Sequence, residues 1–148
     1  MMKGFVIKCS SRKNLKQIGD KIILNLIEKN LEAKYRVLGN YIFLESKGII
    51  DREDIVKEEI YSGKISTSKK EDIFKVIGEL ISILEEPESF AIKVNRNGEH
   101  KYTSTELAKE VAGAPFEKWP KIKVNLDNPD LEINIQIINN RSIIYLRD

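Results

Sequence analysis

SFAIKVNRNGEHKYTSTELAKEV, residues 89–111, is the stretch that decides the fold of this 148-residue chain. Its first part alternates strictly, with Phe90, Ile92 and Val94 apolar and small or polar residues between them. That alternation predicts a strand with one buried face. Residues 96–98, Arg-Asn-Gly, are expected to end the strand in a tight turn, because Asn and Gly tolerate positive backbone angles.

The second part of the same stretch predicts a short helix. Thr103 and Glu106 have the spacing of a capping box, in which Thr103 accepts from a helical amide and Glu106 reaches back. Leu107 and Val111 form an i, i+4 apolar pair. The Gly-Ala-Pro of residues 113–115 is expected to end this helix.

These elements bring polar groups to one place. A strand end, a basic turn and a helix start converge, and the unpaired amides of a helix start attract anions. Arg96, His100 and Lys101 would surround the same spot, where the Ser104 hydroxyl can donate to a phosphate oxygen. The pattern predicts a phosphate-backbone site with no evident place for a reacting atom. His100 has a second interpretation, as a helix-entry residue hydrogen-bonded to backbone.

Two segments of the sequence resemble the THUMP domain family. Residues 90–108, FAIKVNRNGEHKYTSTELA, are similar to the central segment of that domain, and residues 125–133, NLDNPDLEI, to its later strand pair. THUMP domains are RNA-binding modules of tRNA-modifying systems: 4-thiouridine synthetases, certain RNA methyltransferases and pseudouridine synthases, and the adaptor of tRNA cytidine acetyltransferase. In that family the domain follows a small ferredoxin-like domain, and together they hold the tRNA acceptor arm near its 3′ end.

The resemblance implies a set of RNA-binding residues. Its phosphate or ribose contacts would be made by the polar residues of the central segment and of one later hairpin turn: Lys93, Arg96, His100, Lys101, Ser104 and Arg141. In the first half, Lys8, Arg12 and Lys13 would extend the footprint along the acceptor stem. For residues 10–14, Ser-Ser-Arg-Lys-Asn, an ordinary helix cap with solvated charges is an equal alternative.

The rest of the chain predicts an α+β fold in two domains, residues 1–66 and 67–148. The first has the order β-α-β-β-α of a ferredoxin-like half, with strands at 4–9, 35–38 and 41–44, helices at 15–31 and 51–61, and a candidate further strand at 64–66. The second is an α/β THUMP domain with a helix from Ser68 to residue 84, strands at 122–126, 131–137 and 142–146, and a C-terminal β-hairpin. Trp119 is interpreted as a core residue rather than a base-stacking surface.

Charge is unevenly distributed along the chain, although the formal net charge is only +2. Residues 1–47 carry ten Lys or Arg against four Asp or Glu, residues 48–88 six against eleven, and residues 89–148 nine against eight. A basic first third beside an acidic middle is expected if one face meets a polyanion. Helix faces that merely differ in sign are the alternative.

The sequence carries few signs of catalysis. One cysteine, Cys9, and one histidine exclude a disulfide framework and a multi-cysteine metal site, so no cofactor or metal is expected. No apolar run is long enough to span a bilayer, so no membrane partner is expected and the cytoplasm is the expected location. Neither a nucleotide-binding loop nor a nucleophile elbow appears in the sequence, and the catalytic domains of the relatives would lie beyond its last residue.

The sequence therefore predicts a non-catalytic, tRNA-binding adaptor that presents the acceptor arm and 3′ end of tRNA to a separate modifying enzyme. By architecture it most resembles the adaptor of tRNA cytidine N4-acetyltransferase, which makes an acetyltransferase the expected partner. The first alternative is the tRNA-binding subunit of a split thiolation or methylation system. The second is a structural or ribosome-associated RNA-binding protein.

Overall fold

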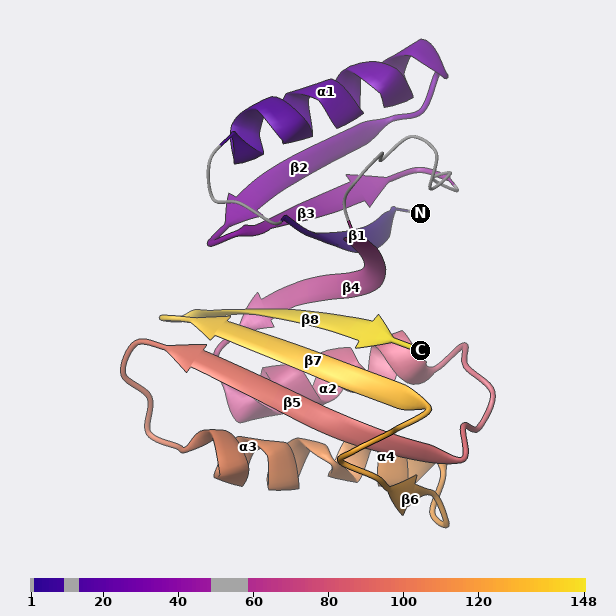
Figure 1. The fold of residues 1–148 in the computed structure, drawn as a ribbon, viewed down its shortest axis with the longest axis vertical. Coiled ribbons are helices and arrows are strands. Elements are labelled where there is room, and N and C mark those ends of the chain that lie inside the picture. The colour runs from indigo at the N-terminus through magenta and orange to yellow at the C-terminus, as the bar shows by residue number, and fades with distance from the viewer. Residues whose placement is uncertain (1, 10–13, 49–58) are drawn as a thin grey trace. The chain divides into compact units, whose positions relative to one another are not determined.

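The structure, a computed structural model, describes residues 2–9, 14–48 and 59–148 (Figure 1). Contacts between residues divide the chain into two compact units, Met1–Gly63 and Lys64–Asp148. The boundary falls within strand β4 (Glu59–Thr67), as do the domain limits predicted at residues 66 and 67. The predicted α+β fold class is confirmed. In the described part of the chain, no helix is long and apolar enough to cross a membrane.

The N-terminal unit is an antiparallel sheet covered by one helix. Its strands β1 (Lys3–Lys8), β2 (Ala33–Leu38) and β3 (Tyr41–Ser46) and the start of β4 lie in the order β2-β3-β1-β4. This is the strand order of a ferredoxin-like fold. The core between sheet and helix contains Cys9, which is buried as predicted, with Ile7 and Leu44 beside it.

Helix α1 (Leu15–Glu28) ends earlier than the predicted residue 31. Asn30 adopts a positive φ of 60°, and the amides of Asn30 and Leu31 donate to the carbonyls of Ile27 and Leu26. These bonds form a Schellman motif, which stops a helix by satisfying its last carbonyls. Leu31 therefore lies beyond the helix and packs against the N-terminal core.

The second helix predicted for this half, at residues 51–61, is wrong at its end. Residues 59–61 are the first residues of β4, and they pair antiparallel with β1. Ile60 faces the N-terminal core, so its apolar character serves a strand instead of a helix. Residues 51–58 lie outside the described residues.

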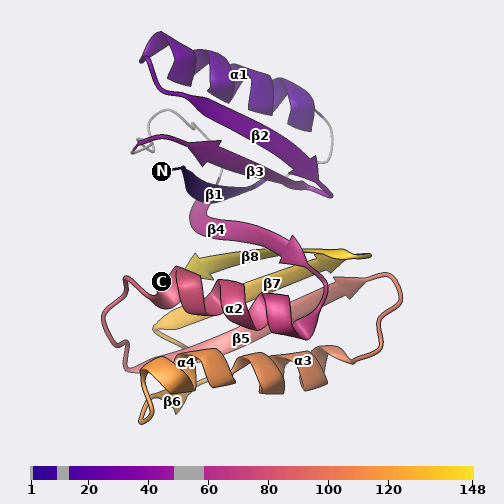
Figure 2. The ribbon, with the colours of Figure 1, turned by 180° about the vertical axis from the view of Figure 1, so that it is seen from behind.

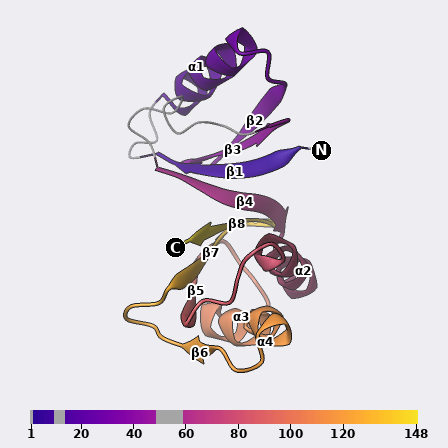
Figure 3. The same ribbon diagram turned by 90° about the vertical axis from the view of Figure 1, so that its right-hand side faces the viewer.

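The C-terminal unit has a mixed sheet with its helices on one face (Figures 2 and 3). Strands β5 (Ser89–Asn97), β6 (Lys123–Val124), β7 (Leu131–Ile138) and β8 (Arg141–Arg147) lie in the order β8-β7-β5-β6. β5 is parallel to both β6 and β7, whereas β7 and β8 form the predicted antiparallel hairpin. The helices are α2 (Lys70–Ile81), α3 (Ser104–Val111) and α4 (Gly113–Lys118).

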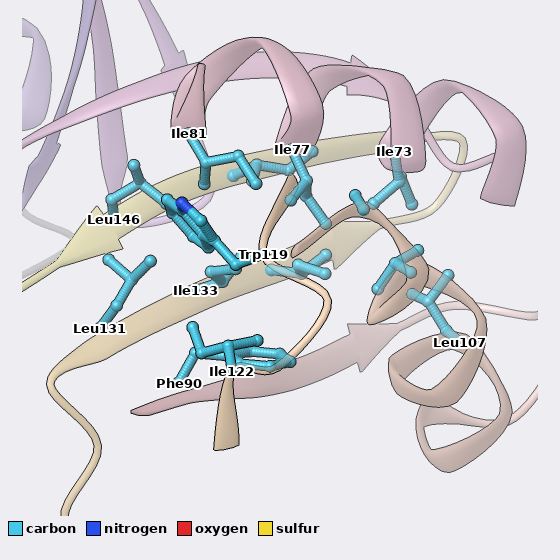
Figure 4. Close-up of a cluster of buried hydrophobic side chains, with 14 of the residues drawn as sticks. Ile73, Ile77, Ile81, Phe90, Leu107, Trp119, Ile122, Leu131, Ile133 and Leu146 are labelled. Carbon is cyan, nitrogen blue, oxygen red and sulfur yellow. The ribbon is translucent and has the colours of Figure 1, made fainter. Parts of the chain in front are cut away.

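The core of this unit lies between the sheet and these helices (Figure 4). Alternate residues of β7, from Leu131 to Ile137, are buried, because successive side chains of a strand point to opposite faces. α2 contributes Ile73, Ile77 and Ile81, all at most 1% exposed. Trp119 is 6% exposed within this cluster, which confirms its interpretation as a core residue.

Two predicted element limits in this unit are wrong, and one helix was not predicted. α3 ends at Val111, just before Gly113, as predicted, but Gly113 and Pro115 then lie in the first turn of α4, where proline is tolerated because its missing N–H has no intrahelical partner. α2 begins at Lys70 instead of Ser68, and the Thr67 hydroxyl accepts from the Lys69 amide just before it. The strand predicted at 122–126 is only the two-residue β6.

One further correction concerns Arg96, which the sequence placed in a turn. β5 continues to Asn97, so Arg96 is a strand residue and the chain turns at Gly98. Gly98 has a φ of +107°, and a Cβ added there would lie 2.6 Å from Oδ1 of Asn139. The loop after β5 therefore packs closely against the turn between β7 and β8.

We expect Gly98→Ala to destabilise the protein by about 1–3 kcal/mol, since alanine strains at this φ and its methyl group would displace Asn139. The matched control is Gly78→Ala in α2, where nothing lies within 4 Å of the added Cβ. It should stabilise the protein by about 0.5–1 kcal/mol through better helix propensity. Urea denaturation of the three proteins checks both signs, and equal stability of Gly98→Ala and the parent would refute the close approach.

Candidate nucleic-acid interface

Three segments of the chain meet at one end of the C-terminal sheet, which we call the hairpin end. They are the β5–α3 loop (residues 98–103), the β7–β8 turn (residues 139 and 140) and the residues just before α2 (67–69). The amide of Asn139 donates to the carbonyl of Asn97 over 2.8 Å, and that of Ser68 to the carbonyl of Asn140 over 3.0 Å. These backbone bonds fix the loop, the turn and the start of α2 relative to one another.

Arg96 is the centre of the hairpin end. Its Nε donates to Ser104 Oγ over 3.2 Å, and its Nη1 lies 3.2 Å from His100 Nδ1. A guanidinium has no acceptor, so His100 Nδ1 must be the unprotonated nitrogen of the ring. Nε2 then carries the proton and donates to the carbonyl of Asn139 over 2.6 Å. A neutral His100 thus joins Arg96 to the β7–β8 turn.

Tyr102 supports this arrangement from the side of α2. Its ring stacks on His100, with 5.5 Å between centroids and 19° between planes, and its hydroxyl donates to the carbonyl of Ser68. Burial raises the pKa of the Tyr102 hydroxyl, against the opposing effect of the positive charges of Arg96 and Lys70. The Lys70 ammonium lies 6.0 Å from the ring centroid. Two cations are therefore close to this aromatic pair.

The start of α3 completes the site. Thr103 Oγ1 accepts from the Glu106 amide over 3.1 Å, which confirms the predicted N-cap. The other amides of a first helical turn have no intrahelical partner and carry partial positive charge. The guanidinium of Arg96 lies near the start of α3, and two of its N–H groups already bond to Ser104 and His100. With the remaining donors of the guanidinium and the Ser104 hydroxyl, the hairpin end can bind an anion such as a phosphate group.

The remaining predicted residues of this unit are divided between the two faces of the sheet. Lys101 is exposed and follows His100 directly, so it lies at the hairpin end. Lys93 is three positions from Arg96 on β5 and therefore on the opposite face, where its ammonium lies 3.0 Å from Glu132 Oε2. Arg141 is exposed at the first residue of β8, next to the turn. Its register partner is Ile138, so it lies on the Lys93 face.

Glu132 shows how firmly Lys93 is engaged. Burial acts to raise the pKa of this carboxyl, but hydrogen bonds from Asn134 and Lys93 outweigh it, so that the pKa is lowered overall. An ammonium that already neutralises a half-buried carboxylate is less available to a second anion. The structure thus brings Arg96, His100 and Ser104 together, with Lys101 beside them, and separates Lys93.

The RNA contacts predicted in the first half of the chain are Lys8, Arg12 and Lys13. Lys8 is exposed at the last position of β1, in the N-terminal unit. Arg12 and Lys13 lie outside the described residues. The RNA contacts assigned to these three residues stay predictions.

Sequence reasoning missed Tyr102, Asn139 and Lys70 as parts of the hairpin end. Asn139 lies in the turn of the predicted C-terminal hairpin, where it has a positive φ of 55° and its carbonyl accepts from His100 Nε2. Tyr102 follows His100 by two positions in the predicted loop. An aromatic residue so near a histidine is a usable sequence signal for stacking of the two rings. Lys70 is 26 or more residues from the others in sequence, so only the fold could place it there.

Comparison with known proteins agrees with this architecture. The THUMP domain model matches residues 68–147. A tRNA sulfurtransferase of Vibrio campbellii is 36% identical over 70 residues, covering 47% of this chain and 14% of that protein. A probable tRNA sulfurtransferase of Methanocaldococcus jannaschii is 28% identical over 150 residues, covering 90% of this chain and 39% of that protein.

A solved structure shows the same fold over nearly the whole chain. It is a 4-thiouridine synthetase in complex with RNA and bound ATP, with a TM-score of 0.72 and 14% sequence identity, covering 99% of this chain and 41% of that one. The present chain thus spans well under half the length of each of these proteins. The matching model covers more than half of this chain and includes all of the hairpin end except Thr67, so the chain belongs to the THUMP domain family.

Proposed function

We propose that this chain binds tRNA for a tRNA-modifying system and that the hairpin end contacts the RNA backbone. The observation that carries the proposal is the position of Arg96, which His100 and Ser104 hold at the start of α3. The proteins named tRNA sulfurtransferase that resemble this chain, and the solved synthetase–RNA complex, support RNA as the ligand.

The binding mechanism would be electrostatic and geometric. Arg96 is oriented before any ligand arrives, so less side-chain entropy is lost when it binds a phosphate. The α3 amides and the Ser104 hydroxyl would complete the contact, with Lys101 adding charge at the rim. A-form RNA is recognised mainly through its shape, its phosphates and its 2′-hydroxyls, so this surface should discriminate little between tRNA sequences.

The part of tRNA that binds is expected to be the acceptor arm with its single-stranded 3′ end, as the family resemblance implies. Unpaired nucleotides let their phosphates and bases approach a small site from several directions, whereas a regular duplex does not. The hairpin end is a small site of this kind, since it consists of one loop, one turn and one helix start.

Thiolation is the modification that the relatives favour. Both relatives compared above carry the name tRNA sulfurtransferase, which fits the split thiolation system better than the acetyltransferase adaptor predicted first. The acetyltransferase partner stays a prediction, as does the cytoplasmic location. We further propose that this chain has a binding role and leaves catalysis to other residues of the system, because the hairpin end holds donors for an anion and no paired nucleophile and base.

Arg96→Ala should weaken binding of unmodified tRNA about tenfold and lower the dependence of log Kd on log salt by about one unit, as expected for one lost phosphate contact. Filter binding or fluorescence anisotropy at two salt concentrations measures both quantities. The matched control is Arg147→Ala, which removes an exposed arginine from the other end of β8. It should change affinity and salt dependence little.

Equal losses for Arg96→Ala and Arg147→Ala would show that only net charge matters and that the hairpin end is not the contact. Arg96→Lys is a useful third variant. It keeps the charge but cannot donate to Ser104 and His100 in a fixed fork, so it should bind between the parent and Arg96→Ala.

Removal of the single-stranded 3′ end from the tRNA should reduce affinity for the parent protein, since those nucleotides are the expected ligand of the hairpin end. For Arg96→Ala, the same truncation should cost much less, because the two changes remove the same contact. Four Kd values, for two proteins and two RNAs, complete this cycle. Additive losses would place the 3′ end somewhere other than Arg96.

A further inference from the structure

A second surface of the C-terminal unit is an apolar groove between β5 and α3, with a volume of about 510 Å³. Its floor is formed by Phe90, Ile92 and Val94, and its walls by Ala108 of α3 and Leu126 of the segment after β6. Lys109 is the one charged side chain among its described lining residues. The groove adjoins the Arg96 cluster, because Ser104, which accepts from Arg96 Nε, is also one of its lining residues.

The floor of the groove is also a free strand edge. β6 pairs with β5 only at Ser89 and Phe90, and among described residues no strand pairs with that edge further along. The Asn125 amide donates to the carbonyl of Phe90, so the polar backbone groups of Phe90 point toward this edge. Those of Ile92 and Val94 point the same way, because backbone direction alternates along a strand.

The wall opposite α3 exposes large apolar side chains. Val124 is 53% exposed and Leu126 is 69% exposed. Val124 is the last residue of β6 that pairs with β5, and Leu126 follows two positions later, so the groove continues the line of β6. Proteins normally avoid presenting exposed apolar side chains and an unpaired strand edge together.

We propose that this groove binds an extended polypeptide segment of a partner protein, which adds a strand to the edge of β5. Such a segment offers alternating donors and acceptors at the spacing that Ile92 and Val94 require, which the sugar–phosphate backbone of RNA does not. Alternate apolar side chains of the segment would fill the space between Ala108 and Leu126. An acidic residue would pair with Lys109, the charged group of the lining.

This inference goes beyond tRNA binding and does not depend on it. It provides an attachment point for a protein partner on the strand that also carries Arg96. The two sites use different parts of β5, because the groove uses its edge and the side chains up to Val94, while the anion site uses Arg96 at its end.

The test uses the full chain and a fluorescein-labelled eight-residue peptide with valine at alternate positions and glutamate or threonine between them. Two further peptides carry backbone N-methyl groups. In one peptide the methyl groups lie on one edge of the added strand, and in the other peptide they lie on the opposite edge. We expect the parent peptide to bind in an anisotropy titration, and one methylated peptide to bind equally well while the other fails. Amide shifts in NMR spectra should centre on Ile92 and Val94.

Leu126→Ser should weaken peptide binding about tenfold through the loss of apolar contact area. Because Leu126 is mostly exposed, this change should leave the fold intact. The matched control is Ile83→Ser, an 88% exposed isoleucine in the same unit but away from the groove, and it should have no effect.

Several outcomes would overturn the proposal. Absence of peptide binding at millimolar concentration would do so, as would equal binding of both methylated peptides or equal loss in the two serine variants. A dimer of the parent chain that Leu126→Ser dissociates would assign the groove to a second copy instead. Shifts of the Ile92 and Val94 amides with a single-stranded RNA, and none with the peptide, would assign it to nucleic acid.

Discussion

The parallel pairing of β5 with β7 is the constraint on which the candidate site depends. Parallel neighbours cannot be joined by a tight turn, so the chain must cross over through helices before it returns to the sheet. The crossover begins with α3, whose start must therefore lie where β5 ends. Because β7 runs in the same direction, its turn into β8 lies at that end too. Strand ends, a helix start and a hairpin turn are brought together by topology.

The side chains at this end of the sheet connect these elements to one another. Arg96 lies on the helix-covered face of β5, one position before the strand ends, and so it reaches α3 through Ser104. His100 spans the remaining distance to the β7–β8 turn, with one nitrogen for Arg96 and the other for the Asn139 carbonyl. The cation is held by partners that leave its charge uncompensated, whereas Lys93 on the opposite face is neutralised by Glu132. This difference in partners distinguishes a cation poised for a ligand from one that stabilises the sheet.

Much of this arrangement could be predicted from local sequence, and the exceptions have physical causes. The alternation in β5, the Thr103 cap and the turn at residues 139 and 140 depend on near neighbours, and all three are found. The end of β5 was misplaced because Asn97 resembles a turn residue, although its carbonyl is paired with the Asn139 amide. Lys93 was grouped with Arg96 because the family resemblance implied both, but strand parity alone puts them on opposite faces.

Long-range pairing explains the other misses. Residues 59–61 were assigned to a helix by their apolar spacing, yet an edge of β1 was available for them to pair with. Lys70 and Ser68 reach the hairpin end only because α2 starts beside the β7–β8 turn. No pattern within a short window of sequence encodes such a contact.

β5 combines three interactions in one strand, and this has a geometric consequence. One edge pairs with β7, the last residues lead into the anion site, and the other edge is open beside the groove. Ile92 and Arg96 are four residues apart, which is about 13 Å along an extended chain. A partner segment seated on the open edge would thus end within a few nucleotides' length of an RNA held by Arg96. A protein bound there would meet the RNA without any movement of the THUMP domain itself.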